Sequence, residues 1–228
     1  MPLTRILEPE VMDSPDDAAD YDSMDHREVN QRFVTDLLAA LPLAPSPESP
    51  APFPDILDLG TGTAQIPIEL CRQHADCRVM AADAAVSMLE LARYNLEIEN
   101  LTHRIELAQV DAKRLPFRDG MFDVVMSNSI VHHIPEPSHV LSEAIRVTNS
   151  GGLLFIRDLL RPESDEQLNQ LVATYTAGAN DHQQRMFAES LHAALALDEI
   201  RALVASLGFM ADGVQQTSDR HWTWSAVR

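Results

Sequence analysis

The hydrophobic positions fall into short apolar runs separated by longer stretches with helical spacing. Runs suited to buried strands occur at 55–59, 77–83, 104–109, 121–128 and 153–158. The stretches 63–74, 84–99 and 137–148 carry apolar residues at the three- and four-residue spacing of one helix face. Strands that alternate with helices in this order predict a doubly wound α/β fold, in which a mostly parallel sheet is covered by helices on both faces.

The last part of the chain shows a different pattern. Residues 209–216 and 221–227 alternate apolar and polar side chains, which predicts a C-terminal antiparallel hairpin. In this hairpin Trp222 and Trp224 share one face and Thr223 points to the other. The region from about 159 to 197 is longer than one connection needs and contains two helical patterns, so we expect a helical lid inserted after the fifth strand.

The first 54 residues are predicted to form a segment that precedes the main domain. Residues 1–20 are acidic and rich in Asp, Pro and Ala, so we expect them to be poorly ordered or draped over the surface. Residues 25–41 predict an amphipathic helix. Six prolines between positions 42 and 54 predict a stiff extended linker. We therefore assign 1–54 to an N-terminal segment with a helical flap, and 55–228 to the main domain.

The charge balance limits the classes of partner. The 228 residues include 35 acidic and 17 basic side chains, a formal charge of −18, and Lys113 is the single lysine. This balance argues against nucleic acid as a partner and fits a neutral or cationic small molecule. No apolar run is long enough to span a membrane, and the start lacks a signal-peptide pattern. We therefore expect no membrane partner and a cytoplasmic location.

Cysteine and histidine spacing does not predict a metal site. Cys71 and Cys77 lack metal-site spacing and a disulfide framework, so reduced thiols are expected. His132 and His133 are adjacent, and neighbouring loop residues rarely aim at one ion. No acidic or cysteine partner stands at a suitable spacing from them, and we predict no bound metal.

The most informative stretch runs from Asp55 to Ala64, where a strand ends in a turn with glycines at positions 60 and 62. Glycines here permit a sharp turn and a close approach of the backbone to a ligand. The dinucleotide fingerprint G-x-G-x-x-G would need glycine at position 65, which is Gln65. The stretch instead resembles the first motif of class I S-adenosylmethionine-dependent methyltransferases, with Asp58 before the glycines. Ala64 replaces the last glycine, and we interpret it as small enough for close helix packing.

Asp83 lies about twenty residues after the glycine turn, at the end of the second strand, where a carboxylate can accept hydrogen bonds from a ribose diol. Capping of the next helix is the alternative role. Similarity to the family implies that Asp111 and the amide of Ala112 read the adenine. Met88, on the apolar face of the helix at 84–99, either packs in the core, which is the simpler interpretation, or covers one face of the adenine. The complete predicted cofactor site comprises Tyr21, Asp58, Gly60, Thr61, Gly62, Asp83, Ala84, Met88, Asp111, Ala112, Asn128 and Ser129.

The N-terminal residues 21–25 look like the Tyr-Asp-x-Met segment of the quinone-biosynthesis C-methyltransferases. In such enzymes this segment closes over the cofactor, although helix capping by Asp22 or Asp25 explains the pattern equally well. The sequence Asn128-Ser129-Ile130-Val131 lacks the Pro-Pro-aromatic clamp of adenine-N6 and protein-glutamine methyltransferases. Those two activities are therefore excluded.

The loop at 132–133 resembles the His-His loop of small-molecule methyltransferases and should leave the sheet where ligands bind. His133 and Asp158, which ends the fifth strand, are our candidates for a catalytic base. A base is needed only if the acceptor must lose a proton. The predicted acceptor contacts are His132, and Arg185, Phe187 and His192 of the lid.

These resemblances predict a Rossmann-like seven-stranded methyltransferase that uses S-adenosyl-L-methionine, releases S-adenosyl-L-homocysteine and methylates a small molecule by in-line transfer. Two alternatives remain open at the level of sequence: a nucleotide-dependent oxidoreductase, and a non-catalytic S-adenosylmethionine-binding regulatory protein. The acceptor atom and the oligomeric state do not follow from the sequence.

Overall fold

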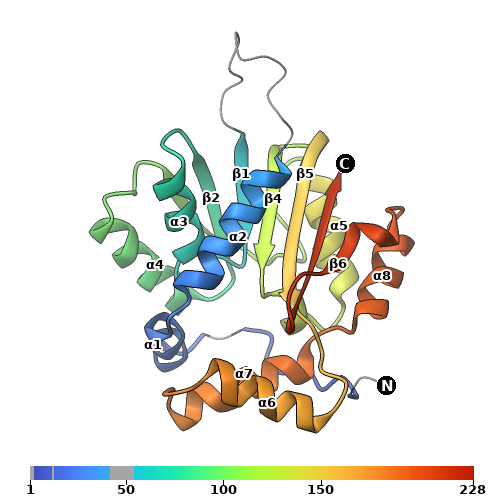
Figure 1. Cartoon of the computed structure of the whole chain (residues 1–228). Coiled ribbons are helices and arrows are strands. Elements are labelled where there is room, and N and C mark those ends of the chain that lie inside the picture. The colour runs from blue at the N-terminus through green and yellow to red at the C-terminus, as the bar shows by residue number, and fades with distance from the viewer. Residues whose placement is uncertain (1–2, 12, 42–53) are drawn as a thin grey trace.

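The computed structural model describes residues 3–11, 13–41 and 54–228, and this part of the chain is built on a seven-stranded sheet (Figure 1). The strand order is β3-β2-β1-β4-β5-β7-β6, which confirms the predicted Rossmann-like fold. The first five strands are parallel, and β7 runs antiparallel to both β5 and β6. The strands are β1 (Asp55–Leu59), β2 (Arg78–Asp83), β3 (Ile105–Gln109), β4 (Phe122–Asn128), β5 (Thr148–Leu159), β6 (Val214–Gln216) and β7 (His221–Val227).

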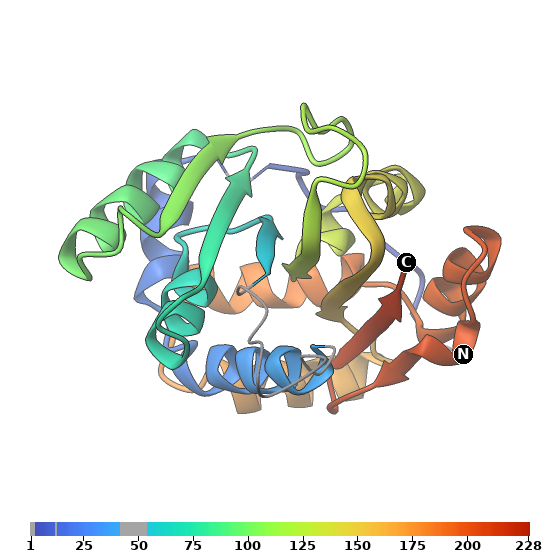
Figure 2. The same ribbon diagram turned by 90° about the horizontal axis from the view of Figure 1, so that it is seen from above.

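Helices cover both faces of the sheet, and Figure 2 shows α2 and α5 on opposite sides of it. In chain order the helical elements are α1 (Pro15–Ser23), α2 (Arg27–Ala40), α3 (Gln65–Gln73), α4 (Val86–Ile98), the short turn η1 (Val131–His133), α5 (Pro137–Val147), α6 (Asp165–Tyr175), α7 (Asp181–Ala193), α8 (Leu197–Ser206) and the short turn η2 (Ala211–Gly213). No helix of the described residues is both long and apolar enough to cross a bilayer.

Alternation along the strands divides the interior into two clusters. Ile56 faces a cluster formed with α2, α3 and α4, whereas Leu57 faces one formed with α5 and α8. Trp222 and Trp224 are fully buried in the second cluster, on one face of β7 as predicted. Phe33 of α2 is fully buried in the first cluster, so this helix belongs to the same core as the sheet. The predicted proline linker lies outside the described residues at 42–53.

The N-terminal segment is more structured than the sequence suggests. Residues 3–11, called the strap below, run extended over the molecule, and residues 15–23 form α1 instead of irregular chain. Ser14 caps α1 by accepting a hydrogen bond from the Asp17 amide at 3.0 Å. The strap is held by backbone hydrogen bonds from Leu3 to Pro162 and from Ile6 to His192. Backbone contacts of this kind leave little signal in composition, which explains the difference.

Two element boundaries also differ from prediction. The fifth strand begins at Thr148 and includes the glycines at 151 and 152, whereas the apolar run predicted a start at residue 153. Its pairing with β4 is irregular between Phe122 and Val124, which absorbs the extra residues. The first strand of the final hairpin is reduced to Val214–Gln216 and is preceded by η2.

The lid forms as predicted after β5. Helices α6 and α7 lie together across the end of the sheet towards which β4 points, beside α1 and the strap (Figure 1). Asn180 and Gln183 form a reciprocal capping box at the start of α7. The lid therefore lies at the edge of the sheet that carries the carboxyl ends of the parallel strands.

Candidate functional site

A cavity of about 320 Å³ lies at the carboxyl ends of β1, β2 and β4. Strand β1 has β2 on one side and β4 on the other, and the direction of chain winding reverses between them. Ligands bind at this position in open α/β sheets. The lining residues are Glu10, Val11, Tyr21, Leu59, Gly60, Gly62, Ala82, Asp83, Ala84, Ala85, Met88, Val110, Asp111, Ala112, Lys113, Asn128, Ser129, Ile130, His133 and Ile134.

The glycine turn forms one wall of the cavity. The amides of Gly60 and Thr61 both donate to the Ala82 carbonyl, at 2.8 and 3.0 Å, which ties the turn to β2. Gly60 and Gly62 have φ values of 74° and 54°, in the left-handed region that favours glycine. The positive φ required at positions 60 and 62 therefore explains why both residues are glycine.

Ala64 is also left-handed, with φ 63° and ψ 23°, and it precedes α3 as its N-terminal cap residue. From the sequence, we considered only its size in helix packing. The structure adds a backbone reason for the glycine that stands there in the family motif, because a side chain costs about 1–2 kcal/mol in this conformation.

Asp83 joins the glycine turn to α4. One carboxylate oxygen accepts from the Gly62 amide at 2.7 Å, and the other accepts from the Ala85 amide at 2.9 Å. Burial raises the pKa of this carboxyl. Each oxygen retains a second lone pair. Asp83 therefore orders the residue before α4 without capping the helix, whose N-cap residue Ala85 makes no side-chain capping bond, and its carboxylate also lines the cavity.

Where the chain leaves β3, Asp111 and Lys113 line the cavity and contact each other. Asp111 Oδ1 accepts from the Lys113 amide at 2.9 Å and lies 3.0 Å from its ammonium. The same ammonium also contacts Glu10 of the strap. The strap is thus joined by an ion pair to the segment predicted to read adenine.

Among the described residues, four buried polar atoms are left without a hydrogen-bond partner on or near the glycine turn: the Thr61 and Thr63 hydroxyls, and one oxygen each of Asp58 and Asn128. Asn128 Oδ1 belongs to a residue that lines the cavity, and Asp58 Oδ2 lies just behind the lining. Burial raises the pKa of Asp58 to about 7, and the nearby charge of Asp83 acts in the same direction. Oxygen atoms without partners suit a cationic donor such as the ammonium of a bound amino acid moiety.

Asp158 is 1% exposed and does not line the cavity. Its Oδ2 accepts from the Val131 amide at 2.5 Å, and its Oδ1 lies 2.5 Å from His132 Nδ1. Burial disfavours charge on His132, but the charge of Asp158 and this hydrogen bond raise the imidazole pKa overall. Asp158 therefore orients η1 and His132 and has no contact with the cavity.

His133 lines the cavity, but its nitrogens are directed to the strap. Nδ1 lies 3.1 Å from Glu8 Oε1, and the ring also hydrogen-bonds the backbone of Pro9. Burial lowers the pKa of His133 to about 3, so the ring is neutral near pH 7. Glu8 Oε1 also lies 3.3 Å from His132 Nε2. Sequence spacing gave no acidic partner for the two histidines. The structure provides one, Glu8, from the strap.

Ten of the twelve residues predicted to bind cofactor line this one cavity; Asp58 and Thr61 lie beside it. Among the other candidates, His133 lines it and Asp158, His132, Arg185, Phe187 and His192 do not. Phe187 packs in the lid core, and Arg185 is exposed. Their proposed contact with an acceptor remains a prediction. The charged lining residues that sequence reasoning missed are Glu10 and Lys113, and no local pattern marks them.

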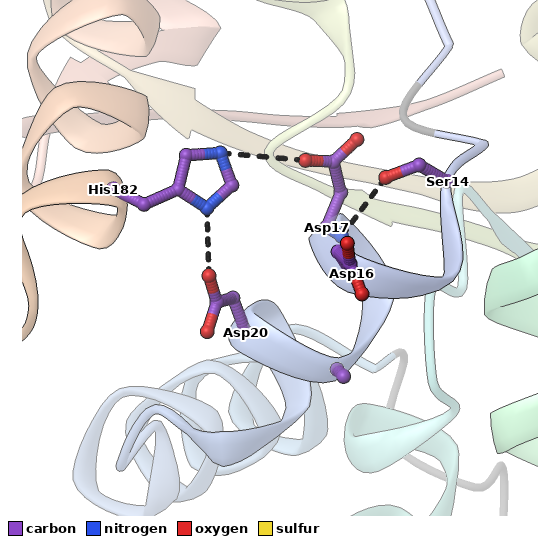
Figure 3. A pocket seen from close by; sticks show the side chains of 6 residues that line it. Ser14, Asp16, Asp17, Asp20 and His182 are labelled. Carbon is purple, nitrogen blue, oxygen red and sulfur yellow. Dashed lines mark hydrogen bonds and ion pairs between the residues drawn. The ribbon is translucent and has the colours of Figure 1, made fainter.

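A second, more open pocket of about 470 Å³ lies between α1 and α7 (Figure 3). His182 Nδ1 lies 2.6 Å from Asp20, and its Nε2 lies 3.5 Å from Asp17. These contacts connect the lid to the N-terminal helix. The pocket does not share its lining residues with the cavity beside the glycine turn.

Comparison with known proteins agrees with this geometry. The model of the methyltransferase domain family matches residues 57–156. Malonyl-[acyl-carrier protein] O-methyltransferase of Geobacter sulfurreducens is 33% identical over 199 residues, which cover 84% of this chain and 66% of that enzyme. Demethylmenaquinone methyltransferase of Thermus thermophilus is 30% identical over 163 residues, covering 68% of this chain and 73% of that enzyme.

Solved structures support the fold. The plantazolicin methyltransferase BpumL, determined in complex with SAH, superposes with a TM-score of 0.70 over 94% of this chain and 91% of its own. The two sequences are 14% identical, so this likeness concerns the fold alone.

Proposed function

Because the chain belongs to the S-adenosylmethionine-dependent methyltransferases, we propose that it transfers the methyl group of this cofactor to a small organic acceptor that binds beside the strap. The observation that carries the proposal is the convergence of ten predicted cofactor residues on one cavity at the switch point of the sheet. The buried Asn128 oxygen without a partner supports a cationic ligand there.

The cofactor site divides into two halves along the cavity. Asp83, Met88, Asp111 and Ala112 would hold the adenosine half. The glycine turn, Asn128, Ser129 and Tyr21 would hold the methionine half, with Asn128 Oδ1 accepting from its ammonium. Tyr21 fits this place because its ring lies beside Gly62. A Cβ atom added to Gly62 would be 3.6 Å from Tyr21 Cε1.

Four of the other lining residues are assigned to the acceptor end: Val11 of the strap, and Ile130, His133 and Ile134 after β4. The sulfonium of the cofactor supplies an already activated methyl group, so the task of the protein is to align the acceptor and exclude water. The strap covers this end of the cavity, so it is suited both to aligning the acceptor and to excluding water. Both nitrogens of His133 contact the strap. Catalysis by alignment of the acceptor therefore needs fewer assumptions than proton removal by His133.

The oxidoreductase alternative receives no support from the family match or from these relatives, which are named as methyltransferases. A regulatory role would show as cofactor binding without turnover.

By name, one relative is an O-methyltransferase of malonyl-[acyl-carrier protein] and another is a methyltransferase of demethylmenaquinone. We therefore propose an acceptor with an acidic oxygen or a phenol-like ring, to be identified by labelled-methyl transfer into fractionated metabolites.

Replacing Asp83 with alanine is expected to weaken S-adenosylmethionine binding by about 1.5–3 kcal/mol, the range for hydrogen bonds to charged groups. Calorimetry measures this change directly. Asp13→Ala is the matched control, because Asp13 accepts from the Ser87 amide at 2.9 Å at the start of the same helix and does not line the cavity. Unchanged affinity in a folded Asp83→Ala protein would restrict Asp83 to holding the glycine turn and the start of α4 in place.

The lid residues provide a separate test of the acceptor site. Phe187→Ala and His192→Ala should raise the KM for the acceptor and leave cofactor affinity unchanged, if movement of the lid brings these side chains to the acceptor. Steady-state kinetics with each substrate varied in turn separates the two effects. Equal losses for cofactor and acceptor would instead mean that the lid only supports the cofactor cavity.

A further inference from the structure

The strap and η1 bring three potential metal ligands together. Glu8, His132 and His133 each offer one ligand atom, and these atoms all lie within 4.8 Å of one another. Glu8 Oε1 is 3.3 Å from His132 Nε2 and 3.1 Å from His133 Nδ1. Within residues 3–11, 13–41 and 54–228, no other three His, Cys, Asp or Glu side chains meet in this way.

Two of the three groups facing the centre of this cluster lack hydrogen-bond partners. Glu8 Oε1 and His133 Nδ1 are both buried and unsatisfied, and the Glu8 side chain is only 9% exposed. Its other oxygen is satisfied, because Ser190 Oγ lies 3.1 Å away and donates to it. Buried polar atoms are rarely left without a partner, and an oxygen and a nitrogen lone pair directed at one point suit a cation.

Both imidazoles are also oriented from behind in the way metal-binding histidines are. His132 Nδ1 lies 2.5 Å from Asp158 Oδ1, so the carboxylate holds the proton on Nδ1, and Nε2 faces Glu8 Oε1. The Pro9 backbone can only accept a hydrogen bond, and since His133 Nδ1 has no partner, the donor is Nε2. Nδ1 of His133 therefore presents its lone pair to the cluster.

We propose that Glu8, His132 and His133 form a binding site for a divalent transition metal of the zinc class, with Asp158 and Pro9 as outer-shell partners. Two imidazoles and one carboxylate are a donor set that suits zinc, iron, cobalt or nickel better than magnesium or calcium. The two carboxylates, Glu8 and Asp158, balance the charge of a divalent ion. Because His133 also lines the cavity, the ion would lie at its wall beside the acceptor end.

The second histidine cluster provides an internal control. His182, Asp17 and Asp20 line the more open pocket of Figure 3, but they offer one imidazole, and that ring already contacts both carboxylates. The His182 side chain is 40% exposed. We therefore expect metal binding at the strap cluster and not between α1 and α7.

The test is titration of the chelator-treated, untagged full-length protein with Co²⁺, followed by visible absorption and by thermal unfolding. We expect one Co²⁺ per chain with d–d bands, and a rise in Tm on saturation. Asp158→Asn should weaken binding by about 10–100-fold, as outer-shell changes do. Glu8→Gln and His133→Ala should weaken it further, and His182→Ala should bind as the wild type does.

Absence of stoichiometric Co²⁺ binding, wild-type affinity in Glu8→Gln, or loss of binding in His182→Ala would overturn the proposal. Circular dichroism of each variant separates loss of the site from loss of the fold, and His133→Ala tests the site without altering a strap residue. S-Adenosylmethionine calorimetry on the metal-free protein is independent of this result, so the proposed methyl transfer and the metal site can fail separately.

Discussion

The free energy of unfolding of the ligand-free protein should fall by about 4 kcal/mol through Asp58 alone as the pH rises from 4 to 8. Burial raises the pKa of this carboxyl to about 7, against an ordinary value of 3.8. Between these values the folded state holds a proton that the unfolded state has released. The contribution of Asp58 is therefore complete below pH 3.8, declines as the pH rises and is lost above about pH 7.

Chemical denaturation at several pH values measures this effect. Other groups titrate in the same range, so the contribution of Asp58 is the difference between the wild type and Asp58→Asn, whose amide does not ionise. Saturating S-adenosylmethionine should flatten the wild-type profile, because a cationic ligand group near Asp58 would lower its pKa. Parallel pH profiles for the two proteins would show that Asp58 has an ordinary pKa in the folded state.

Gly60→Ala is expected to destabilise the fold by about 2–5 kcal/mol and to weaken cofactor binding. Its φ of 74° costs a side chain about 1–2 kcal/mol. A Cβ at this position would lie 1.8 Å from Ile130 Cγ2, and overpacking of this kind adds about 1–3 kcal/mol. Since Ile130 lines the cavity, its displacement also takes space from the ligand.

Gly178→Ala is the matched control. Gly178 has a similar φ of 87°, but a Cβ there would meet nothing within 4 Å. Its substitution should therefore cost only the backbone term and leave cofactor affinity unchanged. Urea unfolding and calorimetry of both variants measure the difference, and equal effects on stability would mean that Ile130 moves away from Gly60 without cost.

Local patterns predicted most of the framework. The apolar runs that became β1 to β4, the glycine turn and the paired tryptophans of β7 each depend on residues within a few positions of one another. The carboxyl ends of parallel strands share one edge of the sheet, so residues just after them could be assigned to a common site from their order along the chain. Eight of the residues assigned in this way line the cavity; Tyr21 and Met88, which also line it, stand on helices and were not assigned from strand order.

The same reasoning did not establish how side chains at that edge are used. Asp158 ends a strand at the carboxyl edge, yet its side chain turns to η1 and His132 instead of the cavity. Arg185, Phe187 and His192 belong to the lid but lie outside the cavity lining. Side-chain direction depends on helix rotation and on packing against neighbours, which residue spacing alone does not specify.

The sequence by itself determined the order of elements, the strand–turn–helix cofactor motif and an acidic surface, because all three depend on local periodicity or on composition. Tertiary structure decided the course of the strap, the left-handed conformation of Ala64 and the meeting of Glu8 with His132 and His133. Glu8 lies in an acidic segment without periodicity, and only the folded path of the chain brings it to η1. Contacts between segments so distant in sequence are set by the packing of the whole molecule.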